Sequence, residues 1–196
     1  MSRRAAFLDR DGVIVSLVPD ERTGTLESPY RPVDVALERG AAEGLRVLRD
    51  AGYLLCVVSN QPSAAKGFTT VAHLDAVEER ARVLLHGDGI ELDAWRRCLH
   101  HPAGVIEELA GRCPCRKPAP GLLVDAAREL ELDLQESWMI GDADSDVAAG
   151  RAAGCRTLLV QSPGSAHRRT GAMRPDGHTR NLVEAATFIL QAAPIP

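Results

Sequence analysis

The feature that most constrains the fold of this chain is a series of short apolar runs, each followed by polar residues and a helix-like segment. The runs Tyr53–Val58 and Arg156–Val160 show no regular alternation of polar and apolar side chains. Uninterrupted runs of this length are typical of strands that are buried on both faces of a parallel sheet. Five such strands are predicted, at Ala5–Leu8, Tyr53–Val58, Ala94–Leu99, Ser137–Ile140 and Arg156–Val160.

Between these runs, apolar residues recur at the three- and four-residue spacing of amphipathic helices. Leu74, Val77 and Ala81, for example, share one side of a segment that is otherwise rich in glutamate and arginine. Strands and helices that alternate in this way favour a three-layer α/β/α sandwich, Rossmann-like, around a mostly parallel sheet. The predicted helices are Ala41–Ala51, Val71–His86, Gly121–Leu132, Asp146–Ala153 and Asn181–Ala192.

Two stretches rich in proline, glycine and charged residues, Pro19–Val35 and Ser162–Thr179, are predicted to be surface loops. Such loops are either solvated connections or segments that face a substrate, and the sequence leaves both interpretations open.

The composition excludes several classes of protein. The chain has 196 residues, with 23 basic and 27 acidic side chains and a net charge of −4. The resulting pI of 5.9 argues against a general binder of nucleic acid or of anionic membranes. No apolar run reaches the ~18 residues of a membrane span, and the start MSRRAAFLDRDG is too short and too quickly acidic for a signal peptide. We therefore expect a cytoplasmic protein.

The five cysteines are an odd number, and three of them, Cys98, Cys113 and Cys115, lie within eighteen residues. The spacing is Cys-x-His, twelve residues, then Cys-x-Cys, and four such ligands in two close pairs can surround Zn²⁺ tetrahedrally. Either His100 or His101 can supply the nitrogen, and the spacing favours His100. The alternative is a set of reduced cysteines in a loop and a strand, without metal.

Carboxylates follow two of the predicted strands. Asp9 and Asp11 follow the first strand, and Asp142, Asp144 and Asp146 follow the fourth. Ligands of open parallel sheets bind beyond the carboxyl ends of the strands, and clustered carboxylates repel one another unless a cation lies among them. Oxygen ligands of this kind suit Mg²⁺. Aspartate is also common in turns and helix caps, which is the preferred interpretation of Asp144.

Two further segments carry polar groups to the same edge. The second strand ends at Ser59-Asn60-Gln61, which offers a hydroxyl and two amides to an anion. Lys117 precedes a predicted helix, so its ammonium and the helix N-terminus can meet one phosphate. Taken singly, a turn after a strand and a surface lysine are equally ordinary interpretations.

In combination these segments resemble the haloacid dehalogenase (HAD) superfamily of phosphohydrolases. Its four ordered motifs match FLDRDGV, VVSNQ, RKPAPG and IGDADSD, over residues 5–160. The cysteine cluster resembles the zinc-containing histidinol-phosphatase branch, and within it the phosphatases that act on D-glycero-D-manno-heptose 1,7-bisphosphate. The resemblance implies one capless phosphatase domain over residues 1–196, with the zinc loop 98–115 inserted before Arg116-Lys117.

The resemblance also implies the roles of individual residues. Asp9 would be the nucleophile that forms an aspartyl-phosphate, and Asp11 the general acid and base. A catalytic Mg²⁺ and a structural Zn²⁺ are implied, with a small phosphorylated sugar as substrate, no nucleic acid or membrane partner, and a monomeric state. The implied sites are Asp9, Asp11, Ser59 and Lys117 for catalysis; Asn60, Gln61 and Arg116 for substrate; Asp9, Asp11 and Asp142 for Mg²⁺, with Asp146 behind them; and Cys98, His100, Cys113 and Cys115 for Zn²⁺.

Three departures from the family pattern bear on the substrate. Pro62 follows Gln61 where serine is usual, Ala143 replaces the usual lysine, and the loop Pro19–Pro32 is longer. The phosphatase chemistry remains implied, while L-histidinol phosphate or another small sugar phosphate is the alternative substrate. A non-catalytic zinc module and a phosphotransfer receiver domain are rivals from other classes. The net charge opposes the zinc module, and the position of the Asp-x-Asp pair opposes the receiver domain.

Overall fold

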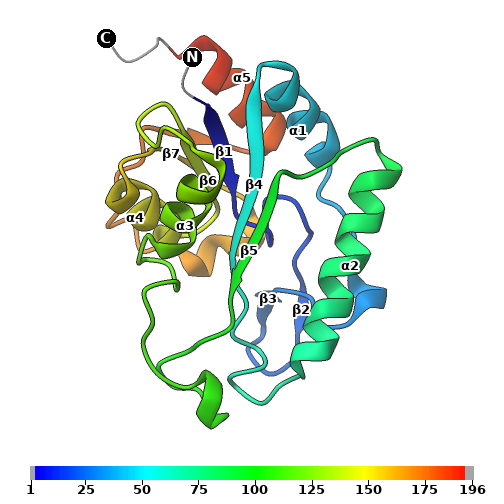
Figure 1. The fold of residues 1–196 in the computed structure, drawn as a ribbon. Helices are drawn as coiled ribbons and strands as arrows, with labels where there is room; N and C mark the ends of the chain where they lie inside the picture. The colour runs from blue at the N-terminus through cyan, green and yellow to red at the C-terminus, as the bar shows by residue number, and fades with distance from the viewer. Residues whose placement is uncertain (1–2, 193–196) are drawn as a thin grey trace.

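The computed structural model describes residues 3–192 and shows a six-stranded sheet in the order β5-β4-β1-β6-β7-β8 (Figure 1). Every neighbouring pair in this sheet is parallel. The predicted α/β/α class is therefore confirmed. The strands of this sheet are β1 (Arg4–Leu8), β4 (Tyr53–Asn60), β5 (Ala94–Cys98), β6 (Trp138–Gly141), β7 (Arg156–Val160) and β8 (Gly177–Thr179).

Helices cover both faces of the sheet. Figure 1 shows α3 and α4 gathered on one side and α1 and α2 on the other. Strand β1 illustrates why: Ala6 and Leu8 pack in the core with α1, α2 and α5, whereas Ala5 and Phe7 pack with α3 and α4. Successive side chains of a strand point to opposite faces, so both faces of this strand are apolar. The helices are α1 (Ala41–Asp50), α2 (Val71–Gly87), α3 (Gly121–Leu130), α4 (Asp144–Ala153) and α5 (Leu182–Gln191).

The second strand of the predicted set is longer than its apolar run. Strand β4 continues to Asn60, and Ser59 and Asn60 pair with Arg97 and Cys98 of β5. Polar residues can occupy the end of a strand because its backbone remains paired with the neighbour. Ser59 and Asn60 are thus held by the sheet itself.

Both predicted surface loops contain regular structure. The first holds an antiparallel hairpin of β2 (Val18–Asp20) and β3 (Thr25–Glu27), followed by the short 3₁₀ helix η1 (Pro32–Asp34). The second holds the 3₁₀ helix η3 (Pro163–Arg168) and the edge strand β8. These elements are three to six residues long and lack apolar periodicity, so the sequence pattern did not reveal them. A further 3₁₀ helix, η2 (Glu107–Leu109), lies between β5 and α3.

Within residues 3–192, none of the helices combines the length and the apolar character that crossing a membrane requires. The prediction that the start of the chain is no signal peptide rests partly on residues 1–2, which lie outside the described part.

Close packing of α4 against β6 and β7 sets the position of the loop between them. At Gly150 an added Cβ would lie 2.6 Å from Cβ of Met139 and 2.8 Å from Cγ2 of Thr157. The helix can approach the sheet this closely only because position 150 has no side chain. The approach also places the first turn of α4, with Asp146, beside the end of β6.

We predict that Gly150→Ala destabilises the fold by about 1–3 kcal/mol, although alanine is the better helix former. The added methyl group forces α4 away from Met139 and Thr157. Urea unfolding measures the change in free energy. Gly87→Ala is the matched control, since nothing lies within 4 Å of its added Cβ, and it should be neutral or stabilising. Equal stability of the two variants would contradict the packing argument.

Candidate active site

Three carboxylates converge where β1 and β6 end. Asp9 directly follows β1, Asp142 directly follows β6, and Asp146 lies in the first turn of α4. One oxygen of each lies within 4.8 Å of the others, and all three residues are buried. Gly12 allows this approach, because a Cβ there would lie 2.2 Å from Oδ2 of Asp142, and its φ of +84° suits glycine.

Lys117 neutralises part of this charge. Its Nζ lies 2.9 Å from Oδ1 of Asp9 and 2.7 Å from Oδ1 of Asp146, and it donates to the carbonyl of Val58 at 2.7 Å. Burial by itself lowers the pKa of the ammonium, but Asp146 and then Asp9 outweigh it, so the pKa of Lys117 is raised. Lys117 is therefore a permanent buried cation in contact with Asp9.

Asp142 has no comparable partner. The residue is fully buried, and neither of its carboxylate oxygens accepts a hydrogen bond from the described residues. Burial raises the pKa of Asp142 well above its usual range, and the charge of Asp9 raises it further, while Arg168 acts in the opposite direction. A buried carboxylate without hydrogen bonds is costly unless a cation meets it. The three carboxylates therefore fit a hard divalent ion such as Mg²⁺.

Asp11 belongs to a different network. Its two oxygens accept hydrogen bonds from Nε of Arg10 at 2.8 Å and from Nε2 of Gln61 at 2.6 Å. Arg10 also donates to Oε1 of Gln61, and Gln61 donates to Oγ of Ser59. All four residues are buried. Gln61, which the family resemblance implied as a substrate ligand, here orients Asp11, while Arg10 lies inside the FLDRDGV motif and had not been singled out.

Asn60 acts on the backbone of Lys117. Its side-chain amide donates to the carbonyl of Lys117 at 2.9 Å and accepts from the amide of Lys117 at 3.0 Å. This double contact fixes the segment before α3 against the end of β4. Asn60 therefore lies where it was expected, although its amide atoms are engaged with the protein.

A cleft of about 300 Å³ opens over these groups. Cations line it as well as carboxylates: Lys66 and Arg116 beside Lys117, and Arg168 from η3. Glu27 at the end of the hairpin and Ser28 directly after it line the same cleft, so part of each predicted loop does face the site. The sequence shows that residues 162–179 are rich in charged side chains, but no pattern in it marks Arg168 as part of the site. The residues that line it are Asp9, Asp11, Glu27, Ser28, Asn60, Pro62, Lys66, Arg116, Lys117, Ala143, Ser145, Asp146 and Arg168.

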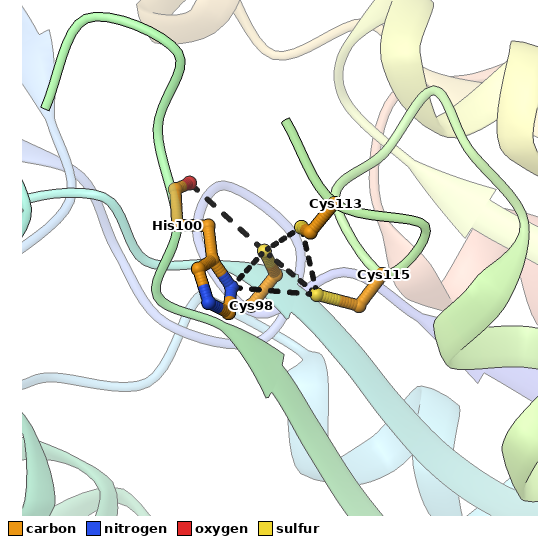
Figure 2. A group of neighbouring side chains, drawn as sticks. All are labelled: Cys98, His100, Cys113 and Cys115. Atoms are coloured by element: carbon orange, nitrogen blue, oxygen red, sulfur yellow. Dashed lines mark hydrogen bonds between the residues drawn. The ribbon is translucent and has the colours of Figure 1, made fainter. Parts of the chain in front are cut away.

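Three cysteines and a histidine point toward one another (Figure 2), and Cys115 directly precedes Arg116 of the cleft. The sulfurs of Cys98, Cys113 and Cys115 lie 2.9–3.3 Å apart, and Nδ1 of His100 lies 3.7–3.8 Å from the sulfurs of Cys98 and Cys115. His101 is turned elsewhere and accepts a hydrogen bond from the amide of Ala103. The four groups around one point form a candidate metal centre.

These distances fit zinc better than a disulfide. A disulfide requires about 2.05 Å between two sulfurs, far shorter than any of these separations. A tetrahedral site with Zn–S bonds of about 2.3 Å has S···S edges of about 3.8 Å, so the sulfurs need to spread by less than ~1 Å to hold the ion. The cluster can therefore hold zinc with small side-chain movements.

Comparison with known proteins places the chain among hydrolases of one kind. A family model described as HAD-hydrolase-like matches residues 114–185. The chain is 39% identical to the D-glycero-D-manno-heptose-1,7-bisphosphate 7-phosphatase of Thermosynechococcus vestitus, over 83% of this chain and 81% of that protein. It is 34% identical to the D-glycero-beta-D-manno-heptose-1,7-bisphosphate 7-phosphatase of Pseudomonas aeruginosa, over 97% of this chain and 100% of that protein.

A solved structure is similar over nearly its whole length. It is the D,D-heptose 1,7-bisphosphate phosphatase of B. bronchiseptica, complexed with magnesium and phosphate. The TM-score is 0.79 at 27% sequence identity, covering 97% of this chain and 99% of that one.

The two cysteines outside the cluster, Cys56 and Cys155, are buried, so their reactivity reports on the core. Burial raises the pKa of Cys56 and of Cys155 to about 12, so only about one thiol in 10,000 is ionised at pH 8. We predict that neither reacts with a water-soluble disulfide reagent in the folded protein. After unfolding in guanidinium, all five cysteines should react. Rapid modification of Cys56 or Cys155 in the folded protein, identified by peptide mass, would contradict this description.

Proposed function

This chain belongs to the HAD-like hydrolases, in the family of D-glycero-D-manno-heptose-1,7-bisphosphate 7-phosphatases, and on this premise we propose that it removes the 7-phosphate of that sugar through an aspartyl-phosphate on Asp9. The observation that carries the proposal is the contact between Asp9 and Lys117 at the floor of the cleft, at 2.9 Å. Lys117 lies directly against the carboxylate of Asp9 and offers positive charge to an incoming phosphate.

In the first step an oxygen of Asp9 attacks phosphorus, and the bond from phosphorus to the sugar oxygen breaks. Asp11 gives a proton to the departing oxygen. In the second step water attacks the phosphorus of the aspartyl-phosphate, Asp11 takes a proton from that water, and Asp9 is regenerated with release of phosphate. The hydrogen bonds from Arg10 and Gln61 fix the orientation of the Asp11 side chain, which lines the same cleft.

Asp9 and Asp142, with the backbone carbonyl of Asp11, would hold Mg²⁺, and the lack of hydrogen bonds to Asp142 supports this assignment. Asp146 contacts Lys117 and accepts from the amide of Ala143, so its proposed role is to position Lys117. When bound, Mg²⁺ neutralises charge on the phosphate oxygens. Ser59 is buried beneath Gln61 and supports the same network.

The cations of the cleft favour a substrate with two phosphates. Lys66 and Arg116 line the cleft beyond Lys117, and Arg116 is steadied by donating to the carbonyl of His100 at 3.1 Å. These charges suit a second phosphate, whereas the imidazolium of L-histidinol phosphate would be repelled. Arg116 is proposed to bind the phosphate that is not hydrolysed.

Zinc would act structurally in this scheme. Cys115 immediately precedes Arg116 and Lys117, so an ion held by Cys98, His100, Cys113 and Cys115 would fix the segment that presents both cations. Four protein ligands leave no open position for substrate. Thiols must stay reduced to bind zinc, which supports a cytoplasmic location. The monomeric state stays a prediction.

The experiment that tests the proposed function compares kcat/KM for Mg²⁺-dependent phosphate release from three substrates. They are the α and β anomers of the heptose 1,7-bisphosphate and L-histidinol phosphate. We expect a preference of about 100-fold, or ~2.7 kcal/mol, for one of the bisphosphates. Similar slow rates on all three would reject the sugar assignment, and no release from any would reject the phosphatase.

We predict that Asp9→Asn abolishes turnover, because the amide is a poor nucleophile and cannot carry the phosphoryl group. Removing a nucleophile usually lowers kcat by several orders of magnitude, so residual activity above a few per cent of wild type would reject the assignment. Asp144→Asn is the matched control at the same edge of the sheet. Its carboxylate accepts hydrogen bonds from the amide and hydroxyl of Thr170, so this variant should keep most of the activity.

We predict that Cys113→Ser lowers zinc content and stability together, and that it lowers activity through disorder of Arg116 and Lys117. Zinc per chain is measured by atomic emission, and stability by thermal unfolding. Cys155→Ser, which changes a buried cysteine outside the cluster, should leave the zinc content unchanged. Full activity of zinc-free Cys113→Ser would show that the cluster is dispensable.

A further inference from the structure

Arg168 is a partly buried cation of the cleft to which neither the family motifs nor the scheme above assign a role. It is the last residue of η3, 26 residues beyond Asp142 in the chain, and only 17% of its side chain is exposed. It lines the cleft together with Asp9 and Asp11.

The fold fixes the backbone beneath this side chain. The next residue, Arg169, donates to the carbonyls of Asp142 at 3.2 Å and Ser162 at 2.8 Å and to the hydroxyl of Ser165 at 2.7 Å. Gly164 packs so closely on the hairpin that an added Cβ would lie 2.8 Å from Leu26. Segment η3 is thus held against β3 and against Asp142, the residue after β6, so the backbone that carries Arg168 is fixed beside the cleft.

The guanidinium itself is held loosely. It lies 3.5 Å from Oδ2 of Asp142 and 3.3 Å from Oε2 of Glu27. Hydrogen bonds between a charged N–H donor and a carboxylate are usually 2.7–2.9 Å long. Lys117 in the same cleft meets all its partners within 2.9 Å. Arg168 therefore lies between two carboxylates without binding either closely.

Asp142 is the group for which Arg168 and a divalent cation would compete. Arg168 forms an ion pair with its carboxylate, and Asp142 is also a proposed Mg²⁺ ligand. A divalent ion at Asp142 would repel the guanidinium and remove its attraction to that carboxylate. The N–H donors of the Arg168 guanidinium would then be free to face the cleft. Ala143, in the lining of the same cleft, contributes no charge there.

We propose that Arg168 is a phosphate-binding residue that exchanges partners, from Asp142 to the phosphate oxygens of the substrate, when Mg²⁺ binds at Asp142. The planar guanidinium fork matches two phosphate oxygens at once. Glu27 keeps the side chain beside the cleft during the exchange. This inference rests on the proposed function for its substrate, but its test does not require turnover.

The test is calorimetric titration of wild-type protein and Arg168→Gln with Mg²⁺ alone, and with inorganic phosphate at saturating Mg²⁺. Without the competing guanidinium, Arg168→Gln should bind Mg²⁺ at least about threefold more tightly. Without its donors, it should bind phosphate at least about tenfold more weakly. A purely structural role for Arg168 would weaken both ligands or neither.

Lys66→Gln is the matched control, because it removes the same charge from the same cleft and Lys66 forms no ion pair with Asp142. An equal gain in Mg²⁺ affinity in this variant would overturn the competition, and unchanged phosphate affinity in Arg168→Gln would overturn the binding role. If Arg168→Gln does not fold, the same titrations are made with Arg168→Lys, which keeps the charge but lacks the planar fork. Phosphate affinity equal to that of the wild type in this variant would overturn the proposal. Failure of the proposed function would appear separately, as a wild-type protein that hydrolyses none of the three substrates.

Discussion

The site depends above all on one buried ammonium group between two carboxylates. Lys117 joins Asp9 at the end of β1 to Asp146 in α4, and its third donor reaches the backbone of β4. Removing one partner of a buried ion pair leaves an uncompensated charge, which is far more costly than the pair itself. This contact therefore links three separate segments and sets the position of the nucleophile. Asn60 binds the backbone of the same lysine through two hydrogen bonds, and the cysteine cluster includes Cys115, two residues before it.

Much of the fold and of the site could be predicted because local patterns carry it. Buried parallel strands have continuous apolar runs, and acids directly after such runs lie at the edge where ligands bind. This reasoning brought Asp9, Asp142 and Lys117 to one place, and the structure does bring them together. Two pairs of ligands separated by a short loop likewise indicated the cysteine and histidine cluster.

What could not be predicted depends on contacts between distant segments. Arg168 meets Glu27 across 141 residues of sequence, and neither has a local pattern that marks it. The hairpin and β8 are too short for periodicity, and their pairing depends on neighbours supplied by the rest of the fold. The same limit applies to Gln61: its motif marks it as important, but only the three-dimensional arrangement shows that its amide binds Asp11 and Ser59.

The order of the sheet has a consequence for how the chain acquires its site. Strand β1 lies between β4 and β6, and its partners in β6 are more than 130 residues away in sequence. Long loops of this kind close slowly, because their conformational entropy is lost before distant contacts compensate for it. During synthesis Asp9 and Asp11 emerge first and remain solvated until Lys117 and Asp146 follow. The chemistry of the enzyme is therefore among the last properties to appear as the nascent chain folds. A truncated chain that ends before α4 would hold Asp9 and Lys117 without Asp146, the second carboxylate that contacts the lysine.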